Sequence, residues 1–136
     1  MIEVVVATGA MSLLLVALLS LVSLSLRNSR LAKDRAQGVA LAQEGVELMR
    51  AYRDYNWTKL NTLADGTNYN LPANWVVEDG LAQSCPENRQ IDEFFWRCVQ
   101  LSTVAGKMEV AVSVSWKEGS QVFNTNQVGQ LSLWER

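Results

Sequence analysis

Residues 4–26 read VVVATGAMSLLLVALLSLVSLSL, a stretch of 23 residues without a charge, proline, asparagine or glutamine. As an α-helix it is about 34 Å long, which is enough to cross a bilayer core of about 30 Å. Buried helices of small soluble proteins are seldom apolar on every face over this length. The stretch therefore predicts a helix that spans a membrane or lies among like helices. We expect Val4, Leu13, Leu14, Leu18, Leu21 and Leu26 to lie in that apolar core.

Two other roles for this stretch have to be weighed. A cleavable signal peptide has a positively charged start and an apolar run of about 7–15 residues. Here the only preceding charge is the negative Glu3 and the run is longer, which disfavours that role. A plain single-span anchor stays open. The basic residues within Arg27–Arg35 follow the span, and the positive-inside rule would keep the C-terminal part in the cytoplasm unless a basic leader precedes Met1.

Composition excludes several classes of function. The chain has 136 residues, a net charge of −2 and no histidine, so it lacks the usual general base and the usual zinc ligand. No nucleophile elbow, metal-ligand cluster or phosphate loop appears. The basic cluster Arg27–Arg35 has no interleaved aromatic residues, which argues against nucleic-acid binding. We expect no enzyme, no cofactor, no metal and no small-molecule substrate.

The two cysteines, Cys85 and Cys98, lie 13 residues apart outside the apolar stretch. In a small extracytoplasmic domain such a pair indicates one disulfide, which would stabilise the fold by roughly 3 kcal/mol in the chain-entropy model. The alternative is two unlinked thiols, with one of them in the core of a strand over residues 94–101. Whether the disulfide or the unlinked thiols are expected depends on whether this domain lies in an oxidising compartment outside the cytoplasm.

Residues 27–54 predict an amphipathic continuation of the helix. Apolar residues recur at steps of three, four and seven, and charged residues occupy the other faces. The stripe consists of Leu31, Val39, Ala42, Val46, Met49 and the Tyr52–Arg53 pair. Gly38 and Gly45, seven apart, share a face and would let another backbone approach closely; alternatively they are merely tolerated in the helix.

The helix is expected to end near Tyr55, where a loop rich in Asn, Asp and Gly begins. Asn56-Trp57-Thr58 fits a glycosylation acceptor pattern at Asn56. We favour Trp57 as a core anchor over modification of Asn56.

The C-terminal part predicts an antiparallel sheet. Residues 108–116 alternate between apolar and other residues over nine positions, which is typical of a half-buried strand. Lys117-Glu118-Gly119-Ser120 predicts a hairpin turn into a strand over 121–134, with Gly129 as a bulge or break. Residues 94–101 and 75–78 are expected to form a third and a shorter fourth strand. The apolar stripe of the helix would cover the dry face, which makes the fold class α+β.

The start of the chain resembles a known family. Ile2-Glu3-Val4-Val5-Val6-Ala7 followed by a long apolar helix is similar to the mature N-terminus of type IV pilins and of the pseudopilins of type II secretion. Two weaker stretches support it: residues 42–57, and the C-terminal strands with Trp116 and Trp134, which are similar to the minor-pilin subgroup labelled PilV-like. The resemblance implies a subunit whose head domain covers residues 56–136, with 1–26 in the membrane or filament core and 27–55 as the helical continuation.

The resemblance also implies a role for Glu3, which in this family pairs with the free N-terminal amine of a neighbouring subunit during assembly. The expected partners are copies of the chain, other pilins, the membrane, and the machinery of a pilus or of a secretion system. The expected location is the cytoplasmic membrane of a prokaryote before assembly, and an extracellular pilus or a periplasmic pseudopilus afterwards. The alternative function is a single-span binding or sensor module that does not polymerise.

The chain departs from the family pattern in two respects. At its start, the leader peptide with its terminal glycine and the first aromatic residue of the mature chain are missing, and Glu3 stands two positions earlier than the pattern places it. In addition, the apolar stretch has no helix-breaking proline. Our hypothesis for the first is a start assigned too late, at a leucine codon that also serves as a start. The second argues against a melted segment within the span.

Overall fold

The computed structural model describes residues 1–63, 66–83, 85, 91, 94–104 and 107–132. The helix α1, Ile2–Tyr55, runs for 54 residues without interruption, as the absence of proline predicts. The short helix α2 (Trp57–Asn61) and the 3-10 helix η1 (Val77–Asp79) follow it. The strands are β1 (Asn68–Asn70), β2 (Ala82–Gln83), β3 (Phe95–Val104), β4 (Lys107–Glu118) and β5 (Gln121–Leu131). The chain divides into two units, residues 1–35 and residues 36–136, which are described separately.

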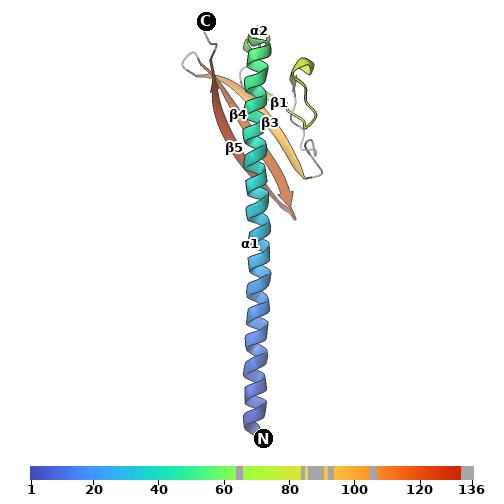
Figure 1. Ribbon diagram of the computed structural model, residues 1–136, viewed down its shortest axis with the longest axis vertical. Coiled ribbons are helices and arrows are strands. Elements are labelled where there is room, and N and C mark those ends of the chain that lie inside the picture. Colours follow the sequence, from blue (N-terminus) through green and yellow to red (C-terminus); the bar gives the residue numbers. More distant parts are fainter. Residues whose placement is uncertain (64–65, 84, 86–90, 92–93, 105–106, 133–136) are drawn as a thin grey trace. The chain divides into compact units, whose positions relative to one another are not determined.

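The second unit contains one antiparallel sheet with the strand order β2-β1-β3-β4-β5 (Figure 1). The three long strands β3, β4 and β5 pair with one another in sequence order, and the short strands β1 and β2 extend the sheet on the β3 side. One face of the sheet packs against residues 38–52 of α1, whose buried residues all lie on one side of the helix. The predicted α+β class is confirmed.

The β4–β5 hairpin forms where the sequence predicts it. Gly119 has a φ of 61°, which a residue without a side chain adopts at little cost, and it lies in the turn between the strands. The prediction of a bulge or break at Gly129 is wrong, because Gly129 pairs directly with Val110 in an unbroken register. The strand ends at Leu131, and residues 133 and 134 of the predicted strand lie outside the described residues.

The predicted fourth strand over residues 75–78 is also wrong. Trp75 closes a turn with Pro72, with its backbone N–H 3.2 Å from the Pro72 carbonyl oxygen, and the 3-10 helix η1 begins two residues later. Instead, Asn68–Asn70, in the segment where the sequence predicts a loop, form the short strand β1 between β3 and the edge strand β2. These residues pair with Cys98–Gln100 of β3, and such pairing partners are not visible in local sequence.

The predicted helix stripe is correct at Ala42, Val46, Met49 and Tyr52, all of which are buried. Val39 is 39% exposed and does not belong to the stripe. Gly38 and Gly45 take the remaining buried positions of this face. The stripe is therefore narrower than the sequence predicts, and its closest contacts are made at glycines.

Gly38 and Gly45 make room for side chains of the sheet and not for the backbone of another element. A Cβ on Gly45 would lie 2.7 Å from a Val112 methyl carbon, and one on Gly38 would lie 2.9 Å from the Trp116 ring. Gly129 has the same role in the sheet: a Cβ there would lie 2.8 Å from a methyl carbon of Val46 of α1. Helix and sheet therefore interlock, with glycines on both surfaces giving room to large side chains opposite.

Candidate functional site

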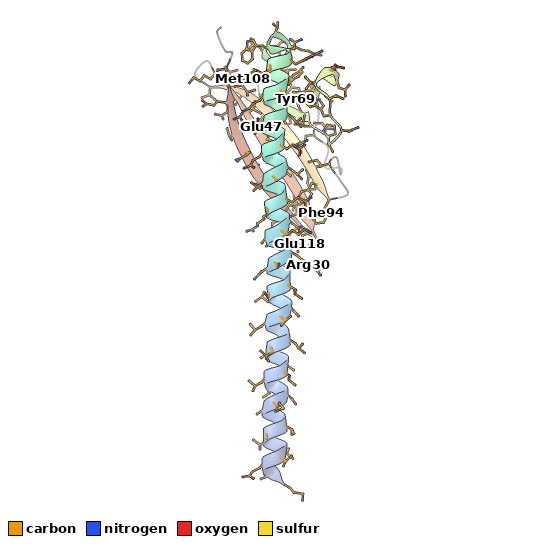
Figure 2. All side chains as sticks on the ribbon, in the orientation of Figure 1. Arg30, Glu47, Tyr69, Phe94, Met108 and Glu118 are labelled. Carbon is orange, nitrogen blue, oxygen red and sulfur yellow. A yellow bond between two sulfur atoms is a disulfide. The ribbon has the colours of Figure 1, made fainter. Side chains whose placement is uncertain are left out.

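The apolar segment of α1 is uncovered by the rest of its unit. Every valine, leucine and methionine from Val4 to Leu26 is between 55% and 74% exposed, and Figure 2 shows their side chains projecting on all sides of the helix. These residues include the predicted core positions Val4, Leu13, Leu14, Leu18, Leu21 and Leu26. The most apolar 18-residue window has a mean hydropathy of 2.5, so the helix is long and apolar enough to cross a membrane. An exposed apolar surface of this size is typical of a segment that contacts a membrane or other chains.

Four hydroxyl groups of this segment, those of Thr8, Ser12, Ser20 and Ser23, donate hydrogen bonds within the helix. Thr8 donates to the Val4 carbonyl oxygen at 2.9 Å, and Ser12 donates to the Thr8 carbonyl oxygen at 2.8 Å. Ser20 and Ser23 make the same bond to the carbonyl four residues earlier. Since an apolar medium penalises only unpaired polar groups, these residues cost less than their composition suggests.

Glu3 lies in the first turn of α1 and is exposed. The N-terminal end of a helix favours a negative charge by a few tenths of a kcal/mol up to about 1 kcal/mol. None of the ion pairs found among the described residues involves Glu3. The Glu3 carboxylate thus lies at the N-terminal end of the exposed apolar helix. Among the described residues it makes no ion pair, so a positively charged group of another molecule could pair with it.

Asn56, the predicted acceptor, has a structural role that the sequence pattern does not reveal. Its Oδ1 accepts a hydrogen bond from the Lys59 backbone N–H at 2.9 Å, which caps α2 directly after α1 ends at Tyr55. Trp57 packs against the core cluster, as expected for an anchor. The capping pattern, with Asn three residues before Lys59, was present in the sequence and could have predicted the second helix.

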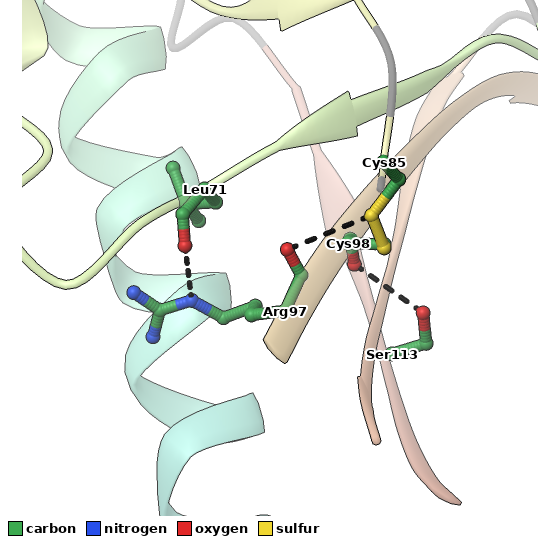
Figure 3. The surroundings of a disulfide bond; sticks show 5 residues. All are labelled: Leu71, Cys85, Arg97, Cys98 and Ser113. Atoms are coloured by element: carbon green, nitrogen blue, oxygen red, sulfur yellow. Dashed lines mark hydrogen bonds between the residues drawn. A yellow bond between two sulfur atoms is a disulfide. The ribbon is translucent and has the colours of Figure 1, made fainter. Parts of the chain in front are cut away.

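Cys85 and Cys98 form the predicted disulfide (Figure 3). Their Cα atoms are 5.8 Å apart, within the usual range for such a bridge. Cys98 lies in β3 opposite Ser113 of β4, on the face of the sheet away from the core residues. The bridge fixes the segment at residue 85 to the centre of the sheet.

Arg97 is the residue that sequence reasoning missed. It lies in β3 between Phe95 and Val99 on the buried face, and it has no exposed surface. Its Nε donates to the Leu71 carbonyl oxygen at 3.1 Å and its Nη1 to the Leu41 carbonyl oxygen of α1 at 2.9 Å. Figure 3 shows the guanidinium turned from the strand toward the helix. The signal was an arginine in phase with the apolar alternation of Phe95, Val99 and Leu101.

The charge of Arg97 is only partly compensated. Burial lowers the pKa of the guanidinium, whereas the nearby carboxylate of Glu44, with an Oε1–Nη1 distance of 3.4 Å, acts in the opposite direction. Arginine remains protonated at neutral pH despite such a shift. Its Nη2 has no partner among the described residues. The arrangement joins helix, sheet and the Leu71 segment through one side chain, at the cost of burying a charge.

Comparison with known proteins adds no relative. No protein-family model, no curated protein and no solved structure matches the chain.

Proposed function

We propose that the chain is a structural subunit of a type IV pilus-like or pseudopilus filament. The observation that carries the proposal is the character of α1. Residues 4–26 are apolar and exposed on every side, whereas residues 38–52 of the same helix bury one face on the sheet of the head. The same helix thus supplies an uncovered apolar segment for a membrane or filament core and, at residues 38–52, a face that packs on the sheet of the head.

Glu3 gives the proposal its specific chemistry. A carboxylate carried into apolar surroundings is costly unless a cation pairs with it. In the family that the N-terminus resembles, the partner is the N-terminal amine of the adjacent subunit. Glu3 would then align each incoming subunit, because only the correct axial position neutralises both charges.

The test separates insertion from assembly. Glu3→Ala is expected to leave the chain in the membrane fraction but to reduce its incorporation into filaments strongly. The matched control is Glu78→Ala, which removes an exposed carboxylate from the head domain and should leave both properties unchanged. Electron microscopy of sheared surface material, followed by peptide mapping, measures incorporation.

Two outcomes would contradict the proposal or part of it. If the chain is found in membranes but never in sheared or purified filaments, it acts as a single-span anchored module. If Glu3→Ala enters filaments as efficiently as the wild type, Glu3 has no role in alignment.

A further inference from the structure

The strand β5 is the last strand of the sheet on its side. In the part of the chain that the structure describes, no strand pairs with its outer side, and Figure 1 shows it, in dark red, at this border of the sheet. Natural edge strands usually carry charged residues, prolines or bulges, which prevent pairing with another chain. From Gln121 to Leu131 there is no charge and no proline, and the register with β4 is unbroken. The backbone of β5 is therefore suited to accept a further strand.

The sequence of β5 is nearly symmetric about Thr125, where it reads VFNTNQV. Two positions are equivalent when they lie equally far from Thr125 on its two sides. Valine occupies both outer positions, Val122 and Val128, and asparagine occupies both inner ones, Asn124 and Asn126. All four residues lie on the exposed face of the sheet, and the two valines are 57% and 58% exposed. A second copy of β5 is therefore a matching partner for the first.

The match appears when the second copy runs antiparallel with Thr125 opposite Thr125. Each Val122 then lies opposite a Val128, so two exposed apolar side chains cover each other. Each Asn124 lies opposite an Asn126, and amide side chains both donate and accept hydrogen bonds. Threonine pairs, such as the one at the centre, also stabilise antiparallel strands.

The match favours a single register. Moving one copy by two residues keeps every side chain on its own face of the sheet. Such a move places Val122 opposite Gln130 in one direction and opposite Asn126 in the other. In both cases the valine faces an amide, and the apolar contact is lost.

We propose that β5 is an interface between two copies of this chain, paired antiparallel about a two-fold axis at Thr125. The pairing joins the two sheets into one, and every contact occurs twice. A two-fold axis perpendicular to the joined sheet leaves α1 on the same face in both copies, with residues 38–52 of the two copies antiparallel. Subunits of one filament all point the same way, so the pair would join chains of two separate filaments or membranes. The inference goes beyond the proposed function and does not depend on it.

Cysteine cross-linking tests both the interface and its register. Val122→Cys and Val128→Cys are made separately in the full chain, whose two native cysteines already form a disulfide. Under mild oxidation in detergent micelles, a mixture of the two variants is expected to form a cross-linked dimer, because the two changed positions lie opposite each other. Either variant alone should cross-link little, since its changed positions in the two copies would be six residues, about 20 Å, apart.

Charge placement tests the same contact through affinity. Wild-type association is expected between about 10 μM and 1 mM in light scattering, as for a small interface. Val128→Lys should weaken it about tenfold or more, because an edge lysine enters the interface twice. Adding Val122→Glu to the same chain should restore it, since each glutamate then lies opposite a lysine of the other copy. Val76→Lys is the matched control at a valine that is 56% exposed outside β5, and it should leave association unchanged.

Thermal melting shows whether the heads of the variants remain folded, and the cysteine mixture decides if a lysine variant does not fold. The proposal is overturned if the mixture cross-links no more than the single variants. It is also overturned if the wild type stays monomeric up to about 1 mM, or if association is as strong in Val128→Lys as in the wild type. These results would leave the proposed function untouched, because entry into a filament is tested at Glu3 and not at β5.

Discussion

Arg97 of β3 donates a hydrogen bond from Nη1 to the Leu41 carbonyl oxygen of α1 over 2.9 Å, so a strand side chain binds the backbone of the helix that covers it. Its aliphatic stem reaches the same helix, since the Arg97 Cδ would lie 2.9 Å from a Cβ on Gly45. The contact therefore combines close packing with a charged hydrogen bond at one point of the helix–sheet interface.

Arg97→Ala should lower the free energy of unfolding of the head by about 3 kcal/mol, because it leaves a cavity and removes the donor to the buried Leu71 carbonyl oxygen and the partly buried Leu41 carbonyl oxygen. Arg97→Met fills the space without burying a charge, and such replacements are often close to neutral. We therefore expect Met to recover more than half of the loss. Denaturant melts in detergent measure both variants, and equal losses would show that the stem contributes nothing.

Gly45→Ala is expected to destabilise the head by about 1–3 kcal/mol, because the added methyl group meets Val112 at 2.7 Å. This is the net loss: the close contact costs more than the roughly 1 kcal/mol by which alanine is more favourable than glycine in a helix interior. Gly9→Ala is the matched control, since no atom lies within 4 Å of its Cβ position. Melting temperatures should fall for the first variant only; a rise for Gly45→Ala would contradict the close packing.

Tyr52→Phe should make the head less sensitive to alkaline pH. Burial, together with the nearby Tyr55, raises the pKa of Tyr52 above its ordinary value of 10.0. The unfolded chain therefore ionises first, so this contribution to stability is complete below pH 10 and is lost as the pH rises through the folded pKa. Unfolding free energies measured across this range should fall less steeply in the variant.

At neutral pH the same variant should be as stable as the wild type or slightly more so. The Tyr52 hydroxyl is buried and has no hydrogen-bond partner among the described residues, so removing it sacrifices no bond. The edge contact of its ring with Trp75, at 5.7 Å between centroids, is retained by phenylalanine. A large loss at neutral pH would reveal a partner for the hydroxyl.

Reduction of the Cys85–Cys98 disulfide should lower the free energy of unfolding by roughly 3 kcal/mol, the loop-closure contribution for a bridge of this span. Cys85→Ser should show a similar loss and no further change with reductant. Melts with and without reductant measure the difference. A wild type insensitive to reductant would show that the bridge does not stabilise the fold in solution.

The sequence predicted those parts of the fold that depend on local patterns. Helix α1 and its end at Tyr55 follow from composition and period, and β3, β4 and the hairpin turn at Gly119 follow from alternation and turn residues. The disulfide was predicted with unlinked thiols as the alternative. The prediction failed at residues 68–78, where a three-residue strand depends on its partner β3 rather than on its own residues.

The sequence by itself determined that residues 4–26 require apolar surroundings, because that requirement is a sum over individual side chains and needs no knowledge of neighbours. Tertiary structure alone decided that Arg97 lies inside, that Gly129 continues a strand, and that β5 is the last strand of the sheet on its side. Each of these depends on which distant segment lies opposite. The buried Arg97 side chain needs hydrogen-bond acceptors, and these are the carbonyl oxygens of Leu41 and Leu71, which lie far from it in the sequence.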